Sequence, residues 1–446
     1  MPYPFEPYKI KVLESIKVLN KNQRLEALRK ANFNLFKIPS EKVTIDLLTD
    51  SGTSALSQEQ WSQIMLGDES YASAKSWERF EASVKHFTGK KIVIPVHQGR
   101  GAEKVIAEAL FQKDDIAFSN GFFDTTRANL EHRGVVCLDV PTERSFDTLK
   151  PALFKGDIDI RKLKQLMVRH KNQAKMVMMT LTNNTGGGQP ASFKNVQLAS
   201  QLARKHNLKF IIDGCRIAEN SYFIWLMEQK RKGSVKDIIR KIFSLSDIAF
   251  VSAKKDGLAN SGGFIVTDDA SSAAKLKELV VLYEGYVTYG GMTGRDMESI
   301  ARGLEEVIEP AYLEHRIEQV AYLHKELSKL GIPLIQPSGG HAVYVDAGKL
   351  LPHISKNNFP GQALAAALYR EGGIRSVEIG FLMYGKTSKP ELVRLAIPRR
   401  AYTQSHFDYV VEIFKKILTN KKQYKGFKIT WQPSLLRHFT CKLKPL

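Results

Sequence analysis

Three apolar runs of strand length, interleaved with a helical pattern, constrain the fold of this chain most strongly. The runs are Ala174–Thr182, Leu208–Asp213 and Ile248–Ser252, and residues 195–207 repeat apolar side chains at helical spacing. Strands that alternate with helices are typical of a parallel sheet with helices on its faces. The sequence therefore predicts an α/β fold with a mostly parallel sheet.

The length of 446 residues allows more than one domain. Pro310 interrupts a long helical pattern, where we expect a kink or a domain boundary. Beyond it, strand-like and helical segments predict a smaller α+β domain. We therefore expect an N-terminal arm and part of the small domain in residues 1–45, a large domain in 46–308, and a small C-terminal domain in 309–446.

The composition excludes several classes of protein. Hydrophobic residues make up 43% and charged residues 25%, as in globular chains, and no apolar run approaches the roughly 18 residues of a membrane span. The start of the chain has no signal-peptide pattern. Cys137, Cys215 and Cys441 are too far apart to predict a disulfide framework or a metal cluster. We expect a cytoplasmic protein without a membrane partner.

The formal net charge of +20 raises the question of a nucleic-acid partner, because basic surfaces release counterions from nucleic acids. The lysines and arginines are spread along the chain, however. No zinc-finger, helix-turn-helix or aromatic RNA-reading signature accompanies them. A solvated basic surface is the favoured interpretation.

Polar residues follow two of the predicted strands. Asp213 closes one, and Lys254 and Lys255 follow another in "IAFVSAKKD". Ligands of open α/β sheets bind at the carboxyl ends of strands, and a buried carboxylate and amine are costly without a partner. Pyridoxal 5'-phosphate (PLP) would use both, since its aldehyde bonds to a lysine and a carboxylate keeps its ring nitrogen protonated. A structural ion pair with a surface lysine is the alternative, and the two strands alone leave both open.

A third segment, "VHQGRGAEKVIAEAL", reads as a strand, a glycine-rich turn and an amphipathic helix. Backbone N–H groups of Gly99 and Arg100 at the start of that helix would bind an anion such as a phosphate. Turns of this kind often bind nothing. Together with the two strand ends, it points to PLP as one ligand that uses all three features.

Motifs along nearly the whole chain resemble the β-eliminating lyases, a family that includes tryptophanases and tyrosine phenol-lyases. They are "IDLLTDSGT", "MLGDESYA", "HQGRGAE", "GGGQPAS", "DGCRIAENSYFI", "SAKKD", "YEGYVTYGGMTGRDME", "RLAIPRRAYTQSH" and "LRHFT". The resemblance implies the aspartate-aminotransferase-like fold of fold type I PLP enzymes, with PLP bound in the large domain. It also implies an amino-acid substrate and a homotetramer whose subunits share active sites.

The resemblance also implies roles for individual residues. Lys255 matches the lysine that bonds to the cofactor, and Asp213 matches the partner of its ring nitrogen. Further cofactor-binding positions are Gln98, Gly99, Arg100, Phe123, Asn184, Arg216, Ser252 and Lys254. Substrate-binding positions are Thr49, Ser51, Asn184 and Arg394, whose guanidinium suits a carboxylate. Positions that match a potassium site are Gly52, Glu69 and Asn260.

The leaving-group pocket distinguishes the sister activities. Asp124, Ile379 and His438 match the tryptophanases, where phenol-lyases carry threonine, arginine and phenylalanine. Protonation of indole at carbon 3 places positive charge on the ring nitrogen, which a carboxylate at Asp124 would stabilise and His438 would orient. A helix cap is the alternative role for Asp124. Tyr71, donated across a subunit interface, matches the general acid.

The sequence thus predicts β-elimination of L-tryptophan to indole, pyruvate and ammonium. One alternative is a tyrosine phenol-lyase, for which Ile379 removes the expected cation. Another is a broader cysteine or serine β-lyase. The alternative from another class is a catalytically retired, basic scaffold that binds nucleic acid, which the presence of Lys255, Asp213 and Arg394 disfavours.

Overall fold

The computed structural model describes residues 5–388 and 390–446, which form two compact units. The sheet unit comprises Ser51–Ser145 and Phe154–Glu314, and the terminal unit comprises the residues up to Asp50, Phe146–Leu153 and His315–Leu446. The boundaries 45/46 and 308/309 stay a prediction. Within the described residues, no helix has the length and apolar character needed to cross a membrane.

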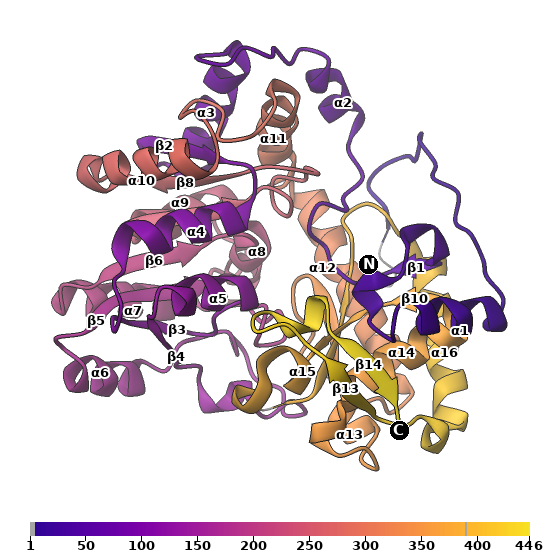
Figure 1. The fold of residues 1–446 in the computed structure, drawn as a ribbon. Helices are drawn as coiled ribbons and strands as arrows, with labels where there is room; N and C mark the ends of the chain where they lie inside the picture. Colours follow the sequence, from indigo (N-terminus) through magenta and orange to yellow (C-terminus); the bar gives the residue numbers. More distant parts are fainter. Residues whose placement is uncertain (1–4, 389) are drawn as a thin grey trace. The chain divides into compact units, whose positions relative to one another are not determined.

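A seven-stranded sheet lies at the centre of the sheet unit (Figure 1). Its spatial order is β2-β8-β7-β6-β5-β3-β4. The bounds are β2 (Ile92–Val96), β3 (Ile116–Ser119), β4 (Val136–Asp139), β5 (Ala174–Thr180), β6 (Lys209–Asp213), β7 (Ile248–Ser252) and β8 (Gly263–Thr267). Strands β3 to β7 pair in parallel, and β8 is antiparallel to both of its neighbours. The predicted mostly parallel sheet is confirmed, and its three predicted strands are the neighbours β5, β6 and β7.

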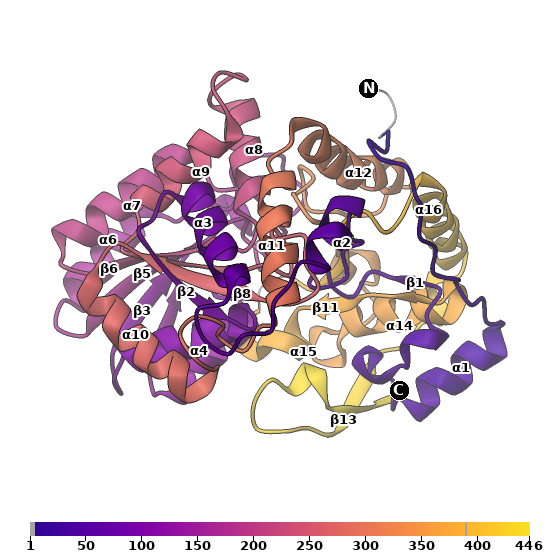
Figure 2. The ribbon, with the colours of Figure 1, turned by 90° about the horizontal axis from the view of Figure 1, so that it is seen from above.

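Helices cover both faces of this sheet. They are α2 (Gln58–Ile64), α3 (Lys75–Thr88), α4 (Gly99–Leu110), α5 (Asp124–His132), α6 (Ile160–Arg169), α7 (Phe193–Lys205), α8 (Ile217–Met227), α9 (Val235–Ser244), α10 (Ala270–Tyr283) and α11 (Gly294–Glu306). Helix α4 packs with α5 and α10, whereas α9 packs with α3, α7 and α8. Figure 2 shows α3 and α9 on one side of the strands and α4 and α10 on the other. Because both faces are covered, the central strands β7 and β8 are buried along their whole length.

The terminal unit joins the two ends of the chain. Its strands are β1 (Ile45–Asp46), β9 (Ala342–Asp346), β10 (Ile374–Arg375), β11 (Val377–Ile379), β12 (Leu392–Ala396), β13 (Phe427–Trp431) and β14 (Lys442–Pro445). Its helices are α1 (Lys21–Lys30), α13 (Ala347–Leu350), α14 (Pro360–Gly372), α15 (Phe381–Tyr384) and α16 (Gln404–Thr419). Strands β11, β12 and β9 form an antiparallel sheet, β1 pairs with β10, and β13 pairs with β14. A late strand meets an early segment in this unit, since Leu443 N on β14 donates at 3.0 Å to Asn32 O, just after α1.

The long helical pattern is divided as Pro310 predicts. Helix α11 ends at Glu306, and α12 (Pro310–Lys329) begins at the proline itself. Proline is favoured at the first position of a helix because its fixed φ suits the helix and its missing N–H would be unpaired there. Pro310 therefore starts a new helix.

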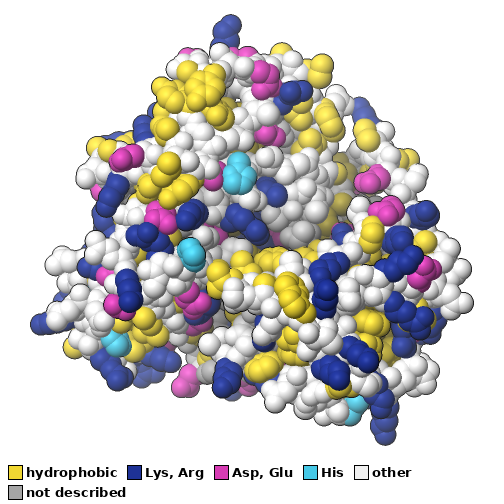
Figure 3. Space-filling model, in the orientation of Figure 1, with side chains coloured by type: hydrophobic (Ala, Val, Ile, Leu, Met, Phe, Trp, Pro, Cys, Tyr) yellow, Lys and Arg dark blue, Asp and Glu magenta, His cyan; other side chains and the backbone are white. Residues whose placement is uncertain are grey.

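The positively charged side chains are dispersed on the face that Figure 3 shows. Lysines and arginines are scattered over the face in Figure 3, among acidic and neutral side chains. This matches their spread along the sequence.

Packing in the central strands should dominate the stability of the sheet unit. Phe250 on β7 is fully buried, so Phe250→Ala should lower the free energy of unfolding by about 3–5 kcal/mol. Urea unfolding of the cofactor-free protein measures this. Val281→Ala on α10 is the control, because Val281 is 53% exposed and its loss should change stability by about 0.5 kcal/mol or less. Equal effects of the two substitutions would contradict the assigned core.

Candidate functional site

The carboxyl ends of β6 and β7 lie side by side. Asp213, the last residue of β6, pairs in register with Phe250 of β7. Beyond it, Cys215 N donates to Asp213 Oδ1 at 3.1 Å, and Ser252 N donates to Cys215 Sγ at 3.2 Å. Two parallel strands and the turn after β6 thus hold the buried Asp213 carboxylate at one edge of the sheet.

Lys255 follows β7 at the same edge. Its backbone N–H donates to Ser252 O at 3.2 Å, which closes a turn directly after the strand. Burial first, and then the charge of Asp213, raise the pKa of the Cys215 thiol well above its usual range, whereas the charge of Lys255 opposes this rise. One thiol therefore lies within the fields of both Lys255 and Asp213. The structure brings together the two groups on which the expected cofactor depends.

The segment predicted to bind an anion adjoins these strand ends. Helix α4 begins at Gly99 after the N-cap residue Gln98, and a Cβ atom on Gly99 would lie 2.8 Å from Ser252 Cβ. The glycine is therefore required for the close approach of α4 to β7. Burial lowers the pKa of Lys254, and repulsion by Lys255 and then Arg100 lowers it further. Three cations near a helix N-terminus suit the binding of a phosphate dianion.

Asp124 is buried at the start of α5, immediately after the N-cap residue Phe123. Its Oδ1 accepts a hydrogen bond from Thr125 N at 2.7 Å. The carboxylate lies in the first turn of α5, but Phe123 and not Asp124 is the capping residue, so the helix-cap alternative for Asp124 is wrong. Asp124 also interacts with a carboxyl group on α4, that of Glu103.

Glu103 is the residue that sequence reasoning missed. It is buried, and its Oε1 accepts a hydrogen bond from Thr126 Oγ1 at 2.8 Å. Burial raises the pKa of its carboxyl group to about 7, the hydroxyl of Thr125 lowers it, and the charge of Asp213 raises it further. A signal was available, because Glu103 lies four residues after Gly99, on the same face of α4 as the predicted anion site.

The remaining predicted residues of the sheet unit differ in their burial. Asn184 and Arg216 are buried, and Arg216 N donates to Leu181 O at 3.1 Å where α8 begins. Tyr71 is 69% exposed, and its ring contacts Tyr286 and Tyr289 at centroid distances of 5.6 and 5.3 Å.

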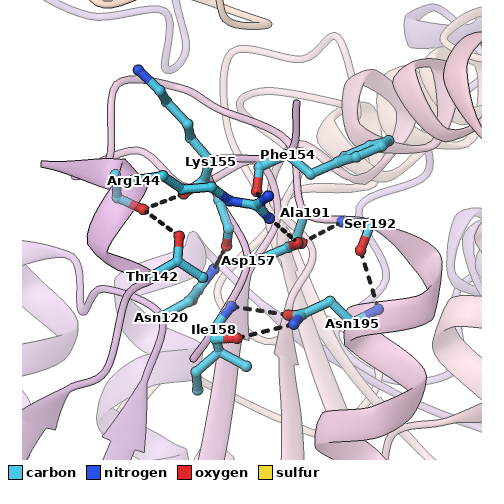
Figure 4. A network of polar contacts seen from close by, with 12 residues as sticks. Asn120, Thr142, Arg144, Phe154, Lys155, Asp157, Ile158, Ala191, Ser192 and Asn195 are labelled. Carbon is cyan, nitrogen blue, oxygen red and sulfur yellow. Dashed lines mark hydrogen bonds and ion pairs between the residues drawn. The ribbon is translucent and has the colours of Figure 1, made fainter. Parts of the chain in front are cut away.

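A polar network fixes the segment that follows β4 (Figure 4). Asn120, which follows β3, donates from Nδ2 to Gly156 O at 2.8 Å and to Thr180 O at 3.1 Å. Asp157 accepts from Arg144 Nη2 at 2.6 Å and from Ser192 N at 2.7 Å. These contacts tie the segment after β4 to the ends of β3 and β5 and to the start of α7.

Of the three positions that match a potassium site, Gly52 and Asn260 contact each other within the sheet unit. Asn260 Nδ2 donates to Gly52 O at 3.1 Å, and Gly52 N donates to Lys254 O at 2.7 Å. Glu69 is engaged elsewhere, since its Oε1 accepts from Arg295 Nε at 2.9 Å. In the described part of the chain, no group of three or more His, Cys, Asp and Glu side chains could hold a metal ion. The potassium site stays a prediction.

The terminal unit contains the other predicted residues. Arg394 is buried on β12, and its Nη2 donates to Leu48 O at 2.9 Å, next to Thr49. Ile379, at the end of β11, is buried in the small core around β12. His438 is buried with its ring 4.1 Å from that of Phe439. Ser51 is the first residue of the sheet unit.

The sequence of the chain matches a family profile and several known proteins. A family profile described as "Beta-eliminating lyase" matches residues 46–413. The chain is 45% identical to a tryptophanase of Hyphomonas neptunium, over 99% of each chain. It is 46% identical to a tryptophanase of Salinibacter ruber, over 99% of this chain and 95% of that protein. It is also 42% identical to a tyrosine phenol-lyase of Clostridium tetani, over 99% and 98%.

Solved structures resemble the chain in fold. Bna3p of Saccharomyces cerevisiae matches with a TM-score of 0.63 at 16% identity, covering 89% of this chain and 95% of that one. A structure described as SPT with PLP matches with a TM-score of 0.62 at 13% identity, covering 89% and 96%. The predicted fold, that of fold type I PLP enzymes, is confirmed.

The anion site predicts a response to phosphate. Inorganic phosphate should raise the thermal midpoint of the cofactor-free protein, by a stabilisation of about 2.7 kcal/mol at a hundred times its Kd. Lys254→Gln should reduce this shift, because it removes a cation from the site. Lys104→Gln is the control, since Lys104 lies on the same helix but pairs with Glu108 at 2.9 Å. Equal phosphate-dependent shifts in both variants would contradict the site.

Proposed function

Because the chain belongs to the β-eliminating lyase family, we propose that it cleaves L-tryptophan to indole, pyruvate and ammonium with PLP as cofactor. One observation carries the proposal: the buried Asp213 and the lysine pair 254–255 lie at the ends of neighbouring strands, beside the start of α4. These are the groups that a fold type I PLP site requires. The tryptophanases among the relatives support the choice of substrate.

PLP, when bound, supplies an electron sink that makes the α-proton of an attached amino acid acidic. Asp213 keeps the ring nitrogen protonated, and its burial strengthens that ion pair. Lys255 would hold the cofactor covalently at rest, and after the substrate amine displaces it, its freed amine would take the α-proton as the general base. Lys254, Arg100, Ser252 and the N–H groups at Gln98 and Gly99 hold the phosphate. Phe123 would hold the ring of the cofactor.

The substrate is held at its carboxylate. Arg394 binds this group through its planar guanidinium, and Thr49 and Ser51 add hydroxyl donors. Arg394 is well suited to the task, because β12 and the Leu48 carbonyl fix its position. Asn184 and Arg216 bind the ring oxygen of the cofactor, and Asn184 also contacts the substrate carboxylate.

The leaving group is recognised by charge. Asp124 accepts the indole N–H and stabilises the positive charge that forms when carbon 3 is protonated. Tyr71 supplies that proton, and His438 helps to orient the Asp124 carboxylate. Ile379 provides an apolar wall where a phenol-lyase would use a cation.

The proposal extends to the assembly and its ions. Tyr71 lies in an exposed aromatic cluster with Tyr286, which supports its donation to the site of a neighbouring subunit in a homotetramer. Potassium would bind at the oxygens of Gly52, Glu69 and Asn260. The three cysteines are unpaired, which supports a reducing, cytoplasmic location.

A comparison of three substrates tests the proposed activity. With PLP, the protein should release indole and pyruvate from tryptophan faster than phenol from tyrosine or thiol from S-alkylcysteine. Lys255→Ala should lower turnover by at least about a thousandfold and remove the visible absorption of the bound cofactor. Phenol release that outpaces indole release would favour the tyrosine phenol-lyase alternative. Salt-sensitive RNA binding without any spectral change would favour the scaffold.

Complementation tests whether the sites are shared. Lys255→Ala and Tyr71→Phe should each be inactive alone. Co-expressed as mixed oligomers, they should recover about a quarter of the wild-type activity, because half of the interfaces are mixed and each rebuilds one of its two sites. Mixtures as inactive as the separate variants would show that Tyr71 acts within its own subunit or not at all.

A further inference from the structure

Three buried carboxyl groups interact inside the sheet unit. They come from three elements: Glu103 from α4, Asp124 from the start of α5 and Asp213 from the end of β6. Their exposed fractions are 8%, 5% and 4%. Both aspartates influence the titration of Glu103, so the three groups share one electrostatic environment. In the proposed function, Asp124 and Asp213 must both be negatively charged, whereas Glu103 has no role.

The hydrogen bonds of Glu103 are unequal. Oε1 accepts from Thr126 Oγ1 at 2.8 Å. Oε2 is buried and has no hydrogen-bond partner within the described residues. An ionised oxygen in that setting is costly, because it has lost water and gained no donor. A proton on Oε2 removes this cost and leaves the bond to Oε1 intact.

The charged and polar groups that face Glu103 act on its ionisation in opposite directions. From α5 these are Asp124 and the hydroxyls of Thr125 and Thr126, and from β6 it is Asp213. The two hydroxyls favour the ionised carboxylate, whereas burial and both aspartates favour the protonated acid. Two anions already present make Glu103 the carboxyl group that holds the proton.

We propose that Glu103 is a positioning residue that keeps a proton on Oε2 within the fields of Asp124 and Asp213, so that the three carboxyl groups carry two negative charges when PLP binds. This inference rests on the proposed function, which requires both aspartates as anions. An ionised Glu103 would add a third negative charge to a site that must accept an anionic cofactor. PLP affinity should therefore fall when this proton is lost.

The direction of the pH effect on stability follows from the burial of the Glu103 carboxyl group. Burial raises the pKa of Glu103 from its ordinary 4.5 to about 7. Between these values the folded protein keeps a proton that the unfolded chain has lost. The contribution of Glu103 to stability therefore falls as the pH rises through this window. Glu103→Gln is neutral at every pH and should remove this dependence.

Infrared spectroscopy of the cofactor-free protein tests the proton directly and does not depend on the proposed function. Because Glu378, Glu391 and Asp157 also have raised pKa values, the test uses the difference spectrum of the wild type minus Glu103→Gln, which should show the carbonyl band of a buried protonated carboxylic acid that disappears with a midpoint at about pH 7. Glu108→Gln on the same helix should keep the band, because Glu108 pairs with Lys104 and its pKa is lowered. Thr126→Val should move the midpoint to higher pH, since it removes a donor that favours the anion. A difference spectrum without this band, or an unmoved midpoint in Thr126→Val, overturns the proposal.

PLP titration of the same proteins tests the consequence. At about pH 8.5 the wild type should bind PLP about tenfold more weakly than Glu103→Gln, and the two should bind equally at about pH 5.5. The same pH dependence in both proteins would overturn the role of Glu103. If neither protein bound PLP, the proposed function would be the part that fails.

Discussion

The parallel pairing of β6 with β7 is the constraint on which the rest of the site depends. It sets Asp213 in register with Phe250, so the residues that follow both strands reach the same edge of the sheet. Cys215 links the two strand ends, since it donates to Asp213 and accepts from Ser252. Parallel strands present their carboxyl ends together, which is why two segments some forty residues apart can serve one ligand.

Charge is distributed unevenly around this edge. The positive charges of Lys255 and Arg100 lower the pKa of Lys254, and the negative charges of Asp213 and Asp124 raise the pKa of Glu103. Each group of like charges is costly without a ligand. A cofactor with an anionic phosphate at one end and a protonated ring at the other would relieve both. The shifted pKa values of Lys254 and Glu103, caused first by burial and then by like charges, support the proposed site.

The sequence was informative where the signal was local. Runs 174–182, 208–213 and 248–252 predicted three adjacent strands because a doubly covered parallel sheet needs continuous apolar segments. The inclusion of Phe146–Leu153 in the terminal unit could not be predicted, because nothing in an eight-residue segment shows which core it joins. Glu103 was missed for a related reason. A glutamate in a helix is ordinarily solvated, and its burial against α5 and β6 depends on contacts between elements distant in sequence.

The attachment of PLP to one lysine is the central claim, and peptide mapping tests it most directly. Reduction of the PLP-loaded protein with borohydride would fix the cofactor to its lysine, and mass spectrometry of the proteolytic peptides would locate it. We predict the added mass on Lys255, with Lys254 unmodified. Label on Lys254, on a lysine outside residues 252–256, or on no lysine at all would contradict the account.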